Sequence, residues 1–231
     1  MKEYRIRSFS DFRTALMECG FTMAGNAHGI FTLLPWGWDE DAPYPTPVRW
    51  HTGDPETDPW EWRMRLLEEY HDVAYGKVFF GVAGFITREW YPYFLACRRE
   101  GADFADIYAE GKLTRTAKTV YETVAREGKV ASHALRNFTG LPKEDTGKID
   151  RAVTELQRQM FLTICGRTRK VNKYGEEYGW NSTVFCTVED FWGGDIAMDI
   201  SPEDAERKIS ARIRELNPDA RDADIRRFIY G

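Results

Sequence analysis

The chain has 231 residues, which is long enough to bury one large core or two small ones. Hydrophobic residues make up 42% and charged residues 30%, as in ordinary soluble globular proteins, and the net charge is −5. No apolar run approaches the roughly 20 residues of a membrane span, and Met1–Arg5 lacks the apolar stretch of a signal peptide, so we expect a cytoplasmic protein with no membrane partner.

The first half of the chain predicts short helices around a long loop. Ser10 is the expected cap of the first helix, whereas Asp58 is the expected cap of the second, with Pro59 in its first turn. The predicted elements are a helix over 9–19, an extended loop over 35–59, a helix over 60–70, a strand or loop over 77–86 and a helix over 89–99.

The second half contains the clearest periodicity. The apolar positions of an amphipathic helix recur at Leu113, Ala117, Val120, Tyr121 and Val124. A short helix capped by Ser132 follows and is ended by Gly140 and Pro142. The predicted elements are helices over 113–127, 133–138 and 143–160, then strands over 161–165 and 183–188. This order is typical of a winged helix-turn-helix, in which the third helix enters the major groove and the wing contacts phosphates or the minor groove.

We therefore predict an α+β fold, mainly helical, with a winged helix-turn-helix core, an aromatic-rich N-terminal region and a C-terminal helical cap. The N-terminal region covers 1–111, and a second, degenerate winged-helix unit is one alternative for it. The winged-helix domain covers 112–193 and a C-terminal helical extension covers 194–231. In the extension, Ser201 caps a helix that ends near Leu216, and a second helix follows.

Positive charge is concentrated in the predicted winged helix. Residues 112–173 contain fourteen Lys or Arg and six Asp or Glu, a net charge of +8, which leaves −13 for the rest of the chain. Clustered positive charge is the electrostatic sign of nucleic-acid binding, although Glu176 and Glu177 weaken it at the wing tip. The expected partner is DNA, as a duplex. The candidate contact residues are Lys148, Arg151, Arg158, Arg167, Arg169, Lys170, Lys173, Trp180 and Asn181.

For Trp180 two interpretations remain open. A tryptophan beside Gly179 at the wing base is favoured to pack under the wing and anchor the hairpin, and the alternative is a contact with nucleic acid.

Other side chains favour structural roles. The four cysteines, Cys19, Cys97, Cys165 and Cys186, form no CxxC pair and are expected to be reduced core residues. The acidic loop 51–58 lacks the calcium-loop pattern, so capping and turn roles are favoured over a metal site. No HExxH, GxSxG or phosphate-cradling loop is present, and we expect no cofactor. The aromatic side chains of 60–93 favour a core role over a base-sized pocket: Trp60, Trp62, Trp90, Tyr91 and Tyr93.

The third helix and wing read "AVTELQRQMFLTICGRTRKVNKYGEEYGWNSTVFCTVEDFW", and upstream stretches read "WHTGDPETDPWEWRMR", "AYGKVFFGVAGFITREWYP" and "YAEGKLTRTAKTVYE". Over about residues 50–192 the chain resembles the AlkZ-related proteins, small winged-helix relatives of the AlkZ/YcaQ-like DNA glycosylases. The resemblance implies winged-helix architecture and a DNA-associated role. The full-length glycosylases are similar to C-shaped stacks of winged helices that excise damaged or crosslinked bases.

The catalytic signature of those glycosylases, a Gln, an apolar residue and then Gln or Asp near the N-terminus, has no counterpart here. The Gln-x-Gln at 157–159 has Arg158 in the middle and lies at the end of the third helix, where residues two apart do not share a face. Whether the chain is an enzyme stays open. We weigh a DNA-binding protein without assigned catalysis, a small glycosylase using acids such as Asp103, Asp106 or Glu110, and a winged-helix interaction scaffold.

Overall fold

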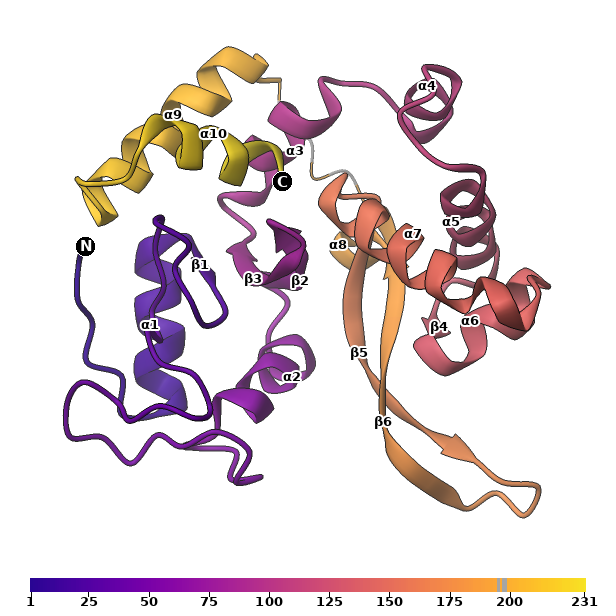
Figure 1. Ribbon diagram of the computed structural model, residues 1–231, viewed down its shortest axis with the longest axis horizontal. Coiled ribbons are helices and arrows are strands. Elements are labelled where there is room, and N and C mark those ends of the chain that lie inside the picture. The colour runs from indigo at the N-terminus through magenta and orange to yellow at the C-terminus, as the bar shows by residue number, and fades with distance from the viewer. Residues whose placement is uncertain (195, 197–198) are drawn as a thin grey trace. The chain divides into compact units, whose positions relative to one another are not determined.

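The chain forms two compact units of helices and antiparallel strands (Figure 1). The computed structural model describes residues 1–194, 196 and 199–231; Asp195, Ala197 and Met198, part of the predicted extension 194–231, lie outside the described residues. Unit 1 comprises Met1–Glu100 and Ala197–Gly231, and unit 2 comprises Gly101–Ile196. The predicted α+β class is confirmed. Within the described residues, no helix is long and apolar enough to cross a membrane.

Unit 1 is built around a small sheet in which β3 lies between β1 and β2 and runs antiparallel to both. The two C-terminal helices, predicted as a separate extension, are part of this unit. Its elements are α1 (Phe9–Cys19), β1 (Phe21–Met23), α2 (Pro59–Glu69), β2 (Val73–Phe79), β3 (Val82–Thr87), α3 (Tyr91–Arg99), α9 (Pro202–Leu216) and α10 (Asp222–Tyr230).

Helix caps follow the side chains that can accept a hydrogen bond from the first turn. The predicted caps of α2 and α9 are confirmed, because Asp58 accepts from the Trp60 N–H and Ser201 from the Asp204 N–H. The predicted cap Ser10 is wrong. Ser8 has the extended backbone that the cap position requires, and its hydroxyl accepts from the Asp11 N–H at 3.1 Å.

The core of unit 1 is aromatic and includes the last helix of the chain. Phe228 on α10 is fully buried and stacks on Phe79 with ring centroids 3.9 Å apart. Phe21 and Phe94 also contact the Phe228 ring, and their ring centroids lie 5.7 and 5.9 Å from its centroid. The buried Arg98 guanidinium donates to the carbonyls of Phe228 and Ile229, which satisfies carbonyls at the end of α10.

Unit 2 contains the elements predicted between 113 and 188, together with α4, β4 and α8, which were not predicted. Strand β6 lies between β5 and β4 and is antiparallel to both. The elements are α4 (Phe104–Ala109), α5 (Arg115–Glu127), β4 (Val130–Ala131), α6 (Ser132–Thr139), the 3₁₀ turn η1 (Lys143–Asp145), α7 (Thr146–Arg158), β5 (Leu162–Val171), β6 (Glu177–Thr187) and α8 (Val188–Trp192).

Two details of unit 2 differ from the prediction. Ser132 is not a cap, because the extended cap position falls on Ala131, which is already held in the β4–β6 ladder opposite Val184. The hairpin strands are longer than 161–165 and 183–188, because backbone hydrogen bonds continue the ladder from Leu162–Thr187 to Val171–Glu177. Figure 1 shows β5 and β6 running beyond the helices of unit 2 as a curved ribbon.

The four cysteines are free thiols with different surroundings. Cys19, Cys97 and Cys186 are buried, as predicted for core residues, whereas Cys165 is partly exposed at a bulge of β5. Burial raises the pKa of Cys19 to about 11 and that of Cys97 to about 12. The hydrogen bond from the Cys186 thiol lowers the pKa of Cys165, and the same contact and burial raise the pKa of Cys186.

The Phe228→Ala substitution tests whether α10 is part of the unit 1 core. We expect the free energy of unfolding to fall by about 3–5 kcal/mol, because the removed ring is fully buried among other rings. Urea unfolding followed by tryptophan fluorescence measures it. The control is Phe138→Ala on α6, where the ring is 48% exposed and the expected change is within about 0.5 kcal/mol. A similar small change for both variants would contradict this assignment.

Alkylation with iodoacetamide tests the cysteine assignments. In the native protein we expect one fast-reacting thiol, Cys165, because it is partly exposed and its lowered pKa makes more thiolate at a given pH. Under denaturing conditions all four thiols react. Cys165→Ser removes the fast phase, and Cys186→Ala shifts its pH profile upward because the hydrogen bond from the thiol is lost. Fewer than four reactive thiols in the protein denatured without added reductant would contradict the assignment of all four cysteines as free thiols.

Candidate nucleic-acid interface

Helix α7 is amphipathic, and its buried side fixes which side faces solvent. Its buried residues are Ile149, Ala152, Val153, Leu156 and Gln157. Lys148, Arg151 and Arg158 are exposed, as expected for positions off the apolar stripe. Arg151 and Arg158 are seven residues apart and therefore share one side of the helix, two turns apart. The predicted helix thus presents three cations to solvent.

The cations of α7 differ in their surroundings. The Lys148 Nζ lies 2.6 Å from the Asp145 carboxylate, one turn back, so part of its charge is compensated. Arg158 is the last residue of α7, where a cation interacts favourably with the helix dipole. Arg151 sits in the middle of the exposed side, next in sequence to Asp150.

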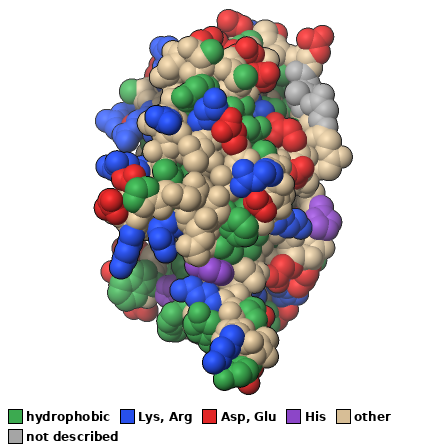
Figure 2. Space-filling view, turned by 90° about the vertical axis from the view of Figure 1, so that its right-hand side faces the viewer, with side chains coloured by type: hydrophobic (Ala, Val, Ile, Leu, Met, Phe, Trp, Pro, Cys, Tyr) green, Lys and Arg blue, Asp and Glu red, His purple; other side chains and the backbone are tan. Residues whose placement is uncertain are grey.

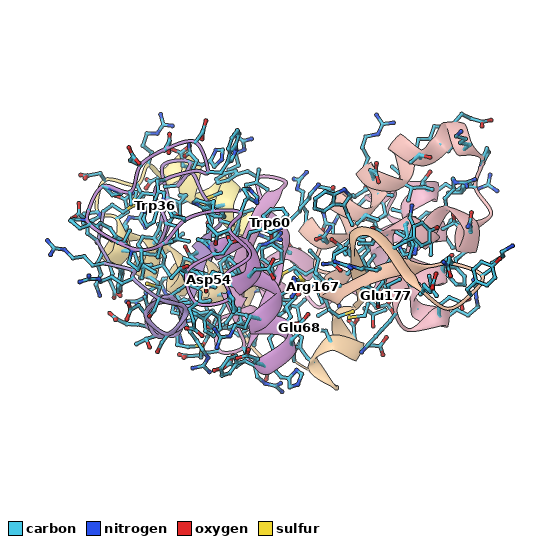
Figure 3. The ribbon with its side chains drawn as sticks, turned by 90° about the horizontal axis from the view of Figure 1, so that it is seen from below. Trp36, Asp54, Trp60, Glu68, Arg167 and Glu177 are labelled. Atoms are coloured by element: carbon cyan, nitrogen blue, oxygen red, sulfur yellow. The ribbon has the colours of Figure 1, made fainter. Side chains whose placement is uncertain are left out.

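The distal hairpin carries the other predicted cations. Arg167 is half-buried on β5, paired with Thr183 on β6, whereas Arg169, Lys170 and Lys173 are exposed. Figure 3 labels Arg167 on β5 and Glu177 at the start of β6. Because Lys170 and Tyr178 are opposite one another in the ladder, their side chains leave the same face of the hairpin. The Lys173 ammonium lies 4.9 Å from the Tyr174 ring centre.

The hairpin turn is closed by one asparagine side chain. The Asn172 Oδ1 accepts the N–H groups of Tyr174 and Glu176 at 2.9 and 3.0 Å. Its Nδ2 donates to the Glu176 carboxylate at 2.9 Å. The Glu176 carboxylate therefore helps to shape the turn, and its negative charge remains at the hairpin tip.

Trp180 does not anchor the hairpin. Its side chain is 94% exposed, so the favoured interpretation, packing under the wing, is wrong. Asn181 is exposed as well. The reason is a bulge in β6: Gly179 adopts a φ of +75°, and extra β6 residues lie opposite Arg169. The indole therefore stays in solvent beside the basic residues of the hairpin.

Charges on the unit 2 surface are mixed over the helices. Figure 2 shows Lys and Arg interspersed with Asp and Glu there, and cationic and apolar side chains together at the lower end, where the hairpin ends. The unit 2 helices therefore do not form one uniformly basic patch in this view. The candidate cations are those of the hairpin and the three on the exposed side of α7.

The Gln-x-Gln pair is not built as a catalytic centre. Gln157 is 1% exposed, and its Nε2 donates to the Val153 carbonyl of the same helix at 3.2 Å. Gln159 is half-exposed at the C-cap of α7. Gln157 therefore belongs to the unit 2 core.

The acids weighed for catalysis also have structural partners. Asp103 and Asp106 form a reciprocal capping box at the start of α4. Glu110 lies 2.7 Å from the Lys112 ammonium. These contacts give none of the three the unpaired, buried setting in which a general acid or base is usually tuned.

In the acidic loop, the capping and turn roles predicted for 51–58 are confirmed. Asp58 is fully buried and accepts three backbone N–H groups, from His51, Gly53 and Trp60, at 2.8–3.0 Å. Across the part of the chain that the structure describes, no group of three or more His, Cys, Asp or Glu is placed to hold a metal ion.

The aromatic residues singled out in the first half of the chain differ in how far they are buried. Trp62, Trp90, Tyr91 and Tyr93 are buried, which confirms the favoured core role for them. For Trp60 on α2 (Figure 3) the core role is wrong, because the side chain is 46% exposed and the Arg63 guanidinium lies 3.4 Å above its ring.

A cavity in unit 1 has no signal in the sequence analysis. Its volume is about 380 Å³, and the loop after β1 supplies most of its lining. Polar lining residues include Asn26, Thr32, Asp39 and Glu40. The Glu40 carboxylate accepts the Gly37 N–H at 2.9 Å, which orders the loop at the cavity edge. Proline and glycine spacing shows that this segment is a loop, but not that it borders a half-open pocket.

Two comparisons find proteins to which this chain is similar. A solved structure, Streptomyces sahachiroi DNA glycosylase AlkZ, is similar with a TM-score of 0.41 and 13% identity. That likeness covers 73% of this chain and 49% of the other, so this chain spans about half the length of the protein it matches. A search of curated proteins finds no match. The family model described as "AlkZ related" matches residues 6–230, and the chain therefore belongs to the AlkZ-related family.

Proposed function

We propose that this protein binds DNA through unit 2, used as a winged helix, with α7 facing the major groove and the β5–β6 hairpin as the wing. The order of α5, α6, α7, β5 and β6 is the order of such a module. We further propose that the winged-helix domain covers residues 112–193. We propose a reducing cytoplasm as the compartment, where thiols such as these four stay reduced.

One observation carries the proposal: the outward cations of α7 and the hairpin lie on elements whose other sides are buried or hydrogen bonded. Arg151 and Arg158 share the solvent side of α7, while Ile149, Val153 and Leu156 hold the opposite side in the core. A helix held in this way presents its cations in a fixed direction. Phosphate contacts from fixed cations release condensed counterions, which supplies affinity without sequence information.

The charge distribution also supports a polyanionic partner. Residues 112–173 have a net charge of +8, and the remainder of the chain has −13. The negative remainder is repelled by phosphates, so it favours approach of the protein by its basic part. Membership of the AlkZ-related family supports DNA as the polyanion.

Base excision is the second candidate function, and the unit 1 cavity is the observation that favours it. A volume of about 380 Å³ is within the usual range for ligand pockets, and Asn26, Asp39 and Glu40 offer groups that can hydrogen bond to a base. No catalytic residue is assigned. The DNA-binding proposal takes precedence because it does not need one.

The salt dependence of binding tests the leading proposal. Replacing Arg169, Lys170 and Lys173 with Ala should flatten the slope of log affinity against log salt by about two to three units, because each lost phosphate contact removes roughly one. Fluorescence anisotropy with a labelled 25-base-pair duplex measures the slope. The effect should be similar for different sequences, since phosphates carry no base code.

The matched control removes the same charge from unit 1. Arg5, Arg7 and Arg226 are exposed there, and their joint replacement by Ala should leave the slope within about half a unit. Equal slopes for the wild type and the hairpin variant, or a wild type that binds no DNA at low salt, would favour the interaction scaffold instead.

An abasic-site assay on alkylated duplex tests base excision. Any activity of the wild type should survive Gln157→Ala and Gln159→Ala within about threefold, because neither side chain is placed in a site. Gln157→Ala should lower the melting temperature by a few degrees, since it removes a buried hydrogen bond worth about 1 kcal/mol. Gln159→Ala is the control for stability. Complete loss of activity in a variant that melts like the wild type would show that the pair is catalytic.

A further inference from the structure

The hairpin displays aromatic rings that the protein does not use for packing. Trp180 is 94% exposed, Tyr174 76% and Tyr178 51%. Large aromatic side chains normally bury most of their surface, and tyrosine and tryptophan left in solvent are enriched where another molecule covers them. These three rings lie within seven residues of one hairpin, which makes them a group rather than scattered exceptions.

The backbone has a specific device that places Trp180 in solvent. In the ladder, Thr168 pairs with Ser182 and Lys170 with Tyr178. Only Arg169 lies between these pairs on β5, whereas Gly179, Trp180 and Asn181 lie between them on β6. The additional β6 residues form a bulge, and the left-handed φ of +75° at Gly179 is a conformation that glycine adopts without strain.

The bulge is held between ordered segments on both sides. Toward the core, pairing continues through Thr183 and Val184 to the buried Phe185. Toward the tip, the Asn172 side chain closes the turn with three hydrogen bonds. The indole is therefore presented from a position fixed at both ends, which reduces the ordering cost of a contact made by it.

The surroundings of the indole indicate what it contacts. Arg169 and Lys170 are in the bulged stretch and Lys173 is at the turn, all exposed. Aromatic side chains interleaved with cations are the recurrent surface for unpaired nucleotides, where bases stack on the rings and phosphates meet the cations. In an intact duplex both faces of a base are already covered by its neighbours. A ring can stack only on a base that lacks a neighbour.

We propose that Trp180 is a stacking platform for an unpaired base, so that the hairpin prefers single-stranded or bulged DNA to an intact duplex. This inference rests on the proposed DNA binding and adds the structural class of substrate to it. The cations supply the salt-dependent attraction, and the indole supplies the preference for unpaired bases. A protein partner is the alternative occupant, and an acidic or apolar protein surface would show no preference among forms of DNA.

The experiment compares one sequence in three forms: an intact 25-base-pair duplex, the same duplex with a single-nucleotide bulge, and the single strand. We expect the wild type to bind the bulged duplex about 5- to 100-fold more tightly than the intact duplex, the range that one stacked base gives. Trp180→Ala should reduce this ratio to about one, because the ring that stacks on the unpaired base is removed. Trp180→Phe should keep part of the ratio because a ring remains.

Trp38→Ala is the matched control, because Trp38 is 74% exposed and lies in unit 1. It should leave the ratio unchanged. As a second measurement, the bulged duplex should quench part of the tryptophan fluorescence of the wild type, and this part should be absent in Trp180→Phe.

The possible failures are distinct. Salt-dependent binding to the intact duplex with a wild-type ratio near one overturns the stacking proposal and leaves the proposed function standing. A ratio that persists in Trp180→Ala, with the quenching unchanged in Trp180→Phe, also overturns it. No binding to any of the three forms overturns both proposals and favours a protein partner for the exposed rings.

Discussion

The β5–β6 ladder is the interaction on which the proposed interface depends. Its inner half carries Leu162, Ile164 and Phe185 in the core of unit 2. Its outer half has no buried side chain from Thr168 to Asn181, apart from the partly covered Asn172, and is kept in shape by backbone hydrogen bonds. An isolated hairpin of this kind is marginal in water. The display of rings and cations therefore relies on packing at the other end of the same strands.

Two bulges determine the direction of the outer half of this hairpin. The inner one places Cys165 out of step with β6, between the pairs of Ile164 and Gly166. The outer one holds Gly179 and Trp180 out of step with β5. Bulges bend and twist a strand where they occur, so the direction of the outer half is determined by two local features. Small backbone changes at either place redirect every side chain beyond it.

Much of the secondary structure follows from the sequence because local signals agree with burial. The bounds 9–19 of α1, the Asp58 cap and both C-terminal helices are reproduced. The full length of the hairpin is not, because its outer half has neither alternating burial nor a strong β pattern. A short strand such as β4 depends on pairing with Phe185 and Val184, which are distant in sequence.

The candidate site, like the fold, is only partly predictable from the sequence. Exposure of Lys148, Arg151 and Arg158 follows from the helix period, since the apolar stripe fixes the opposite side. Trp180 shows the limit of such reasoning. A tryptophan in a strand is usually buried, and only the pairing of Lys170 with Tyr178 reveals that β6 leaves the ladder there. The cavity beside Asp39 and Glu40 could not be predicted, because it is lined by loop residues that follow no periodic pattern.

The division of the chain has a consequence for its synthesis. Unit 2 is continuous from Gly101 to Ile196, whereas unit 1 is interrupted by it and includes α9 and α10. As the chain leaves the ribosome, unit 2 can fold while the core of unit 1 still lacks Phe228, and Arg98 still lacks the α10 carbonyls that it binds. Until then, Phe21, Phe79 and Phe94 pack on one another but lack the ring that covers them from α10. The first hundred residues therefore complete their aromatic core only after unit 2 and α10 have been synthesised.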